Sequence, residues 1–226
     1  MMKTIKGQEN GAVQATLFLP EKSNGTVVYV HTEKEEAQRL WPAVNAAGAA
    51  LVCLEGADWN RDFSPWPAPR AFRKGEDFAG GAGVYLRYLT EKQMPAVERA
   101  LGFSPVRRYI TGYSLAGLFA LYAACETSLF HGAASVSGSL WYDGWLDYFR
   151  RRPLPGTLRS VYLSVGDREK NVRNARIATV EDCTRAAADH LRAQGIQVCF
   201  EHNSGGHFDD PTGRLQKGIC ALLTME

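Results

Sequence analysis

The fold of this chain is decided by residues 106–125, VRRYITGYSLAGLFALYAAC. The first six residues are rich in β-branched and aromatic side chains, and they predict a strand. From Ser114 onward the stretch is apolar nearly all round, which predicts a deeply buried helix. We therefore expect a strand, a sharp turn and a buried helix in direct succession.

Small residues flank Ser114 in this turn. Gly112 lies two positions before it, and Ala116 and Gly117 follow it, so the pattern is GxSxAG. A sharp strand-to-helix turn that presents a nucleophilic serine needs small residues there, because larger side chains would collide. The free N–H groups and the dipole of the helix N-terminus favour a developing negative charge. A plain glycine–serine turn also fits so short a motif, but the flanking strand and buried helix favour Ser114 as a nucleophile.

The rest of the chain alternates short apolar strands with helices. We expect strands at residues 13–19, 26–31, 49–54, 106–111, 132–137, 160–165 and 196–201. We expect helices at residues 33–47, 90–101 (with a threonine cap), 114–125, 177–193 and 214–223. This alternation predicts an α/β fold, a mainly parallel sheet with helices on both faces. Ligands of such sheets bind beyond the carboxyl ends of the strands.

A serine hydroxyl needs a general base, and the expected chain order is serine, acid, histidine. His207 follows the last predicted strand in the segment NSGGHF, where paired glycines form a flexible loop tip. The acid is expected after the preceding strand, where Asp167 and Glu169 are both available. We favour Glu169 because it lies farther out from the strand, whereas Asp167 also suits a turn cap.

An oxyanion hole needs backbone N–H donors aimed at the tetrahedral intermediate. One donor is expected at Leu115, immediately after the serine. The second is expected at Thr32 or Glu33, in the loop after the strand at residues 26–31.

Aromatic side chains concentrate in the loops on this edge of the sheet. Trp59 and Trp66 lie in the long irregular segment 55–83, and loops this long inside a compact domain are usually functional. Trp141 follows the strand at residues 132–137, and Tyr113 lies in the turn itself. We take these four as candidate substrate-binding residues, with a role as packing residues of a cap as the alternative.

Composition limits the classes of partner. The net charge of +2 predicts no nucleic-acid partner, and the short basic run at residues 150–152 is expected to be a solvated turn. Five dispersed cysteines without CxxC spacing argue against a zinc site or a disulfide framework, so no metal is expected. No apolar stretch approaches the length of a transmembrane helix, which favours a cytoplasmic protein without a membrane partner. The sequence leaves the oligomeric state open.

With these motifs in this order, the chain resembles the Putative esterase family of α/β-hydrolases, which includes esterase D and the enterobactin and salmochelin esterases. The likeness spans most of the chain and rests on RDFSPW, TEKQMPAVERAL, GYSLAGLFAL, LSVGDREKNVRN and the terminal GGHF. It implies a single α/β-hydrolase domain over residues 1–226 without a large separate lid. The family often has a His–Gly pair after its third strand, where this chain has His31 and Thr32.

The resemblance implies serine-dependent hydrolysis of a small-molecule carboxylic ester through an acyl-enzyme, without metal or organic cofactor. The family's nucleophile maps onto Ser114 and its base onto His207. Three alternatives remain at this stage. The first is an acyltransferase of the same fold, in which an alcohol replaces water, and the second is a noncatalytic binding protein that retains the turn. The third is a peptidase or thioesterase that uses the same catalytic residues.

Overall fold

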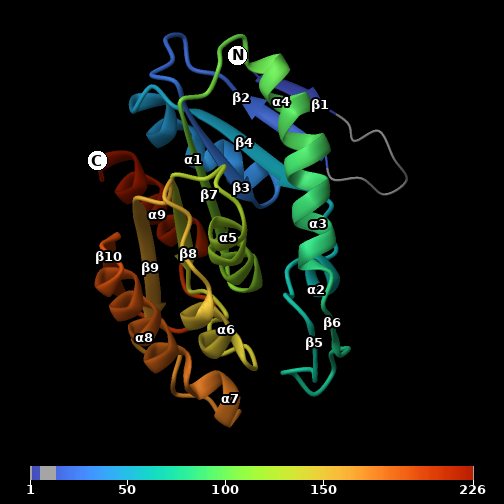
Figure 1. The fold of residues 1–226 in the computed structure, drawn as a ribbon, viewed down its shortest axis with the longest axis vertical. Helices are drawn as coiled ribbons and strands as arrows, with labels where there is room; N and C mark the ends of the chain where they lie inside the picture. Colours follow the sequence, from blue (N-terminus) through green and yellow to red (C-terminus); the bar gives the residue numbers. More distant parts are fainter. Residues whose placement is uncertain (1, 6–13, 226) are drawn as a thin grey trace.

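A central sheet of eight strands organises the computed structural model, which describes residues 2–5 and 14–225. The strands lie in the order β1-β2-β4-β3-β7-β8-β9-β10 (Figure 1). Their bounds are β1 Met2–Ile5, β2 Gln14–Phe18, β3 Thr26–His31, β4 Ala50–Glu55, β7 Arg107–Tyr113, β8 Gly132–Val136, β9 Ser160–Gly166 and β10 Gln197–Asn203. Neighbouring strands pair in parallel from β4 through β3, β7, β8 and β9 to β10, whereas the β1–β2 and β2–β4 pairs at one edge are antiparallel. The predicted mainly parallel sheet is confirmed.

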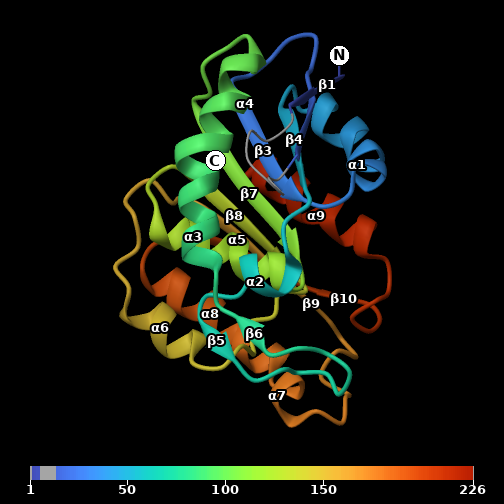
Figure 2. The same cartoon turned by 90° about the vertical axis from the view of Figure 1, so that its right-hand side faces the viewer.

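Helices cover both faces of this sheet, as expected. Their bounds are α1 Lys34–Ala46, α2 Trp59–Asp62, α3 Ala82–Tyr88, α4 Met94–Leu101, α5 Leu115–Glu126, α6 Trp145–Arg151, α7 Ala175–Ala178, α8 Val180–Ala193 and α9 Pro211–Thr224. Figure 2 shows α1 and α9 on one side of the sheet and α3, α4 and α6 on the other. Leu40 of α1 and Ile219 of α9 belong to one buried cluster, whereas another cluster contains Leu86 of α3, Val97 of α4, Phe119 of α5 and Leu191 of α8.

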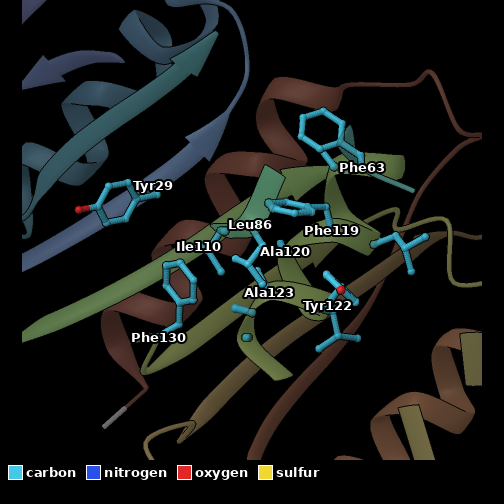
Figure 3. Packing of buried hydrophobic residues seen from close by; sticks show 14 of the residues in the cluster. Tyr29, Phe63, Leu86, Ile110, Phe119, Ala120, Tyr122, Ala123 and Phe130 are labelled. Atoms are coloured by element: carbon cyan, nitrogen blue, oxygen red, sulfur yellow. The ribbon is translucent and has the colours of Figure 1, made fainter. Parts of the chain in front are cut away.

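The helix α5 is buried from end to end, because only its last residue is accessible. Phe119 and Tyr122 of this helix lie among the packed side chains of Figure 3, together with Phe63 and Phe130. A helix that is apolar all round requires such surroundings. Its rigid packing holds the residue at its N-terminus in a defined position.

The predicted helix at residues 90–101 begins earlier than expected. The chain is helical from Ala82 through α3, a π-helical turn at Leu89–Gln93 (η1) and α4. Thr90 is not a cap, since its hydroxyl donates to the carbonyl of Leu86 (2.9 Å) inside the helix. The wide turn ends two residues before Pro95, whose ring lacks an N–H and crowds the preceding turn.

Other differences are local. The segment 55–83 is not wholly irregular, because it contains α2 and the small hairpin of β5 (Pro67–Ala68) and β6 (Phe78–Ala79). Residues 150–152 are exposed, as predicted, but the predicted turn is wrong, since residues 150 and 151 form the last turn of α6. The predicted helix at 177–193 is divided at Thr179 into α7 and α8. Val13, expected in the first strand, lies outside the described residues. Within the described part of the chain, no helix is both long and apolar enough to cross a membrane.

Candidate active site

Ser114 lies between β7 and α5, at the carboxyl end of a central strand. Its φ of 58° and ψ of −120° are uncommon for a residue other than glycine. A backbone held in such a region costs about 1–3 kcal/mol and is typical of functional sites. The turn is tight enough that a Cβ at Gly112 would lie 2.4 Å from the carbonyl oxygen of Ala116. This explains the small residues of the motif.

His207 reaches Ser114 from the loop that follows β10. Its Nε2 lies 2.9 Å from the Ser114 Oγ, and its Nδ1 lies 2.7 Å from Oε2 of Glu169. With the ring proton on Nδ1, the imidazole donates to the carboxylate and accepts from the serine hydroxyl. The chain thus forms a continuous hydrogen-bonded series from Ser114 through His207 to Glu169.

Glu169 is almost fully buried, with 4% of its surface exposed. Its Oε1 accepts from the backbone N–H of Gly166 (2.7 Å), so both carboxylate oxygens are engaged. Burial raises the pKa of this carboxyl, but the hydrogen bond and charge of His207 and the N–H of Gly166 outweigh it. The net pKa of Glu169 lies below its usual value. The group is therefore a stable carboxylate at neutral pH.

Asp167, the alternative acid, is exposed and lies away from the imidazole contacts. Its Oδ1 accepts from the backbone N–H of Gly205 (2.9 Å), two residues before His207. It therefore ties the loop after β9 to the loop that carries His207. Of the two acids that the sequence left available, the structure brings Glu169 to the ring.

Ser114 opens into a cavity of about 490 Å³, a size typical of small-molecule sites. Phe78 of β6 and Ile177 of α7 are among its lining residues. Figures 1 and 2 show both elements beyond the strands at one end of the sheet. The apolar lining residues of the cavity are Trp59, Ala71, Phe72, Phe78, Leu115, Trp141, Val172, Ile177 and Phe208. Four of these are among the exposed large apolar side chains of the described chain, and Phe208 is 82% exposed. The cavity therefore has mainly apolar walls, and the exposed charged residues Arg70, Glu76 and Arg168 also line it.

Two of the predicted aromatic residues, Trp59 and Trp141, line this cavity, and the other two lie elsewhere. The indole N–H of Trp66 donates to the carbonyl of Asp143 (2.9 Å), and its ring packs on Tyr148. Trp66 thus holds loops together outside the cavity. Tyr113 donates its hydroxyl proton to the carbonyl oxygen of His207 (2.6 Å) and so supports the histidine loop.

The two predicted oxyanion donors differ in placement. Leu115 begins α5 and lines the Ser114 cavity, as the turn requires. Thr32 follows His31, whose pairing partner on β7 is Gly112, so it lies beside the turn. Thr32 and Glu33 line a neighbouring cavity of about 580 Å³ instead, and the Thr32 hydroxyl donates to Glu36.

The sequence analysis missed two polar residues at this site. Ser139 lines the cavity, and its Oγ lies 3.4 Å from the Ser114 Oγ. Arg214 contacts Glu169 from α9 and is described below. Neither belongs to a motif, so no local signal marked them. No group of three or more His, Cys, Asp or Glu side chains with metal-binding arrangement occurs among residues 2–5 and 14–225.

Comparison with known proteins places this chain in a family. Residues 24–210 match the family described as "Putative esterase". The chain belongs to this family. The uncharacterized protein YbbA of Bacillus subtilis (strain 168) is 28% identical over an alignment of 162 residues, which covers 69% of this chain and 64% of YbbA. The chain therefore matches slightly less than two thirds of that relative's length.

Solved structures share the fold across nearly the whole chain. An IroE-like serine hydrolase from Shewanella oneidensis has a TM-score of 0.78 at 18% identity, covering 99% of this chain and 79% of that one. The siderophore hydrolase EstA from Aspergillus nidulans has a TM-score of 0.71 at 20% identity, covering 99% and 93%. The enterobactin esterase FES from Shigella flexneri has a TM-score of 0.70 at 18% identity, covering 98% and 59%. At these identities the likeness establishes the α/β-hydrolase fold.

Proposed function

We propose that this chain is a serine esterase that cleaves a carboxylic ester through an acyl-enzyme. The observation that carries the proposal is the hydrogen-bonded series from the Ser114 Oγ to His207 (2.9 Å) and on to Glu169 (2.7 Å). A serine, a base and an orienting acid within hydrogen-bond reach are the arrangement that activates a hydroxyl nucleophile. Membership of the esterase family and the likeness to serine hydrolases support the same reaction.

In the first step, His207 takes the proton of Ser114 through Nε2 while the serine oxygen attacks the ester carbonyl. The carbonyl oxygen becomes an oxyanion, to which the backbone N–H of Leu115 donates at the N-terminus of α5. Glu169 stabilises the imidazolium that forms and fixes the tautomer with the proton on Nδ1. The second oxyanion donor is assigned to Thr32, whose backbone lies beside the turn.

In the second step, the imidazolium protonates the departing alkoxide, and the C–O bond of the ester breaks. Water then enters, gives a proton to His207 and attacks the acyl carbon. The bond from the acyl carbon to the Ser114 oxygen breaks as the imidazolium returns the proton to that oxygen, which releases the acid and restores both residues. The mechanism needs no metal or organic cofactor. The apolar walls around Trp59, Trp141 and Phe72 suit a large apolar acyl group of a small-molecule ester.

The test is hydrolysis of p-nitrophenyl esters by the wild-type chain and by Ser114→Ala. Removal of the nucleophile is expected to lower kcat by about 10⁶-fold while the thermal unfolding midpoint stays within a few degrees of the wild-type value. Full activity in the folded variant would refute the proposal. Added alcohols distinguish the acyltransferase alternative, because a transferase forms the new ester in place of the free acid. A wild-type chain inactive toward a broad ester panel would favour the noncatalytic alternative.

A further inference from the structure

A buried arginine lies behind the proposed catalytic residues. Arg214 belongs to the first turn of α9, and only 2% of its surface is exposed. Its Nη1 lies 3.1 Å from Oε1 of Glu169, 3.1 Å from the Ser137 Oγ and 3.3 Å from the Tyr113 hydroxyl. Its Nη2 donates to the carbonyl of Ser204 (2.8 Å). A buried guanidinium is costly unless it is paired, so this site is built around its charge.

The contacts of Arg214 reach His207 by two routes. Through the side chains, Oε1 of Glu169 accepts from Arg214 while Oε2 accepts from Nδ1 of His207. Through the backbone, the hydroxyl of Tyr113 accepts from Arg214 and donates to the carbonyl of His207. The contact with Ser204 holds the same loop three residues earlier. One guanidinium therefore joins the loops after β8, β9 and β10 to the last residue of β7.

We propose that Arg214 is a positioning residue for this reaction, which fixes Glu169 and the His207 loop in their productive geometry and keeps the carboxylate ionised. The inference rests on the proposed function, since it concerns how the same three residues are held. Arginine suits the task because its rigid fork presents several donors at once, whereas lysine supplies a single point of charge. Arg214 contacts neither Ser114 nor the cavity, so it acts through its neighbours.

Because Arg214 is charged, its removal is expected to change the pH dependence of kcat/KM. The titratable groups that contact it are Tyr113 from β7 and Glu169 after β9. His207, after β10, lies one hydrogen bond beyond Glu169. An exposed ion pair between Arg168 and Asp209 (3.2 Å) lies farther out. Loss of the buried cation removes a positive charge that opposes protonation of the Glu169 carboxylate. Protonated Glu169 no longer orients the imidazole or stabilises its cation, so the acid limb of the kcat/KM profile moves to higher pH.

The experiment compares wild type, Arg214→Met and Arg214→Lys in hydrolysis of a p-nitrophenyl ester across pH, with unfolding midpoints recorded for each. Arg214→Met is expected to lower kcat by about 10- to 100-fold, the effect of losing a hydrogen bond to a charged group, with KM little changed. Its acid limb is expected to move to higher pH. Arg214→Lys keeps the charge, so it is expected to retain the wild-type acid limb and to recover part of kcat.

Arg108→Met is the matched control. Arg108 forms a partly buried, two-bond ion pair with Glu98 (2.7 and 2.8 Å) at the start of β7, remote from Ser114. This variant is expected to lose stability but to keep the kcat and the pH profile of the wild type. If Arg108→Met loses as much stability and as much kcat as Arg214→Met, a structural effect alone would explain both losses. That result would overturn the proposal.

Further outcomes are equally decisive. Wild-type kcat and an unmoved acid limb in Arg214→Met would overturn the role of Arg214 and leave the proposed esterase intact. Failure of the wild type to hydrolyse any ester would instead refute the proposed function. If Arg214→Met does not fold, Tyr113→Phe removes only the hydroxyl between Arg214 and the His207 carbonyl. In Tyr113→Phe, a severalfold lower kcat with unchanged KM supports the proposal, and an unchanged kcat overturns it.

Discussion

Replacement of Glu169 by Gln tests the assignment of the acid, because it keeps the shape of the side chain and removes its charge. The carboxylate is buried and lies 2.7 Å from Nδ1 of His207. Charge centres about 4 Å apart near a protein surface interact by about 4 kcal/mol, and this attraction stabilises the imidazolium formed during attack. Each 1.36 kcal/mol is tenfold in rate, so the loss predicts a kcat lower by about 10³-fold. The amide also favours the wrong imidazole tautomer, which extends the expected range to about 10⁴-fold.

The assay is steady-state hydrolysis of a p-nitrophenyl ester, with circular dichroism to establish folding. Asp167→Asn is the matched control, because Asp167 lies in the same loop and its exposed side chain accepts a hydrogen bond from Gly205. An asparagine retains that acceptor, so its kcat should stay within about threefold of wild type. A folded Glu169→Gln variant whose kcat lies within tenfold of the wild-type value would refute the assignment of Glu169 as the acid. An equal loss of kcat in Asp167→Asn would refute this assignment too.

Three further predictions concern stability and specificity. The pKa of Glu169 is lower in the folded state than its usual value of 4.5, so its contribution to stability is present above that pH and is lost as the pH falls through the folded pKa. In chemical unfolding, the excess free energy of unfolding of the wild type over Glu169→Gln should therefore shrink below pH 4.5. An excess that stays constant with pH would contradict this. Gly112→Ala should unfold at a markedly lower temperature than wild type, because its Cβ would collide with the carbonyl of Ala116. Gly156→Ala is the control, since a Cβ at Gly156 lies in open space and should not lower the unfolding midpoint. Equal unfolding midpoints for the two variants would contradict the tight turn. Phe72→Ala should raise KM roughly tenfold for a large apolar acyl ester and little for an acetyl ester, and an equal effect on both would remove Phe72 from the acyl site.

The turn around Ser114 was predictable because its determinants are local. A β-branched strand, small residues at fixed offsets and an apolar helix occupy consecutive positions in the sequence. The conformation at Ser114 follows from these residues, since Gly112 leaves no Cβ to collide with Ala116. The parallel sheet was predictable for the same reason, as its central strands are continuous apolar runs.

The contacts between loops were not predictable from local pattern. Asp167 and Glu169 are two residues apart, and only the fold decides which of them meets His207. Arg214 carries no motif, because its role depends on α9 packing beneath three loops that are distant in sequence. Aromatic composition likewise suggested a pocket role for Trp66, which instead bonds to Asp143 away from the cavity.

The most direct test of the central claim is to trap the serine adduct with a fluorophosphonate and locate it by mass spectrometry of peptides. A single adduct on Ser114 is expected, with labelling lost in Ser114→Ala and greatly slowed in His207→Ala. An adduct on Ser139, whose Oγ lies 3.4 Å from that of Ser114, would contradict the assignment of the nucleophile. Absence of any adduct on the folded wild-type chain would contradict the esterase mechanism itself.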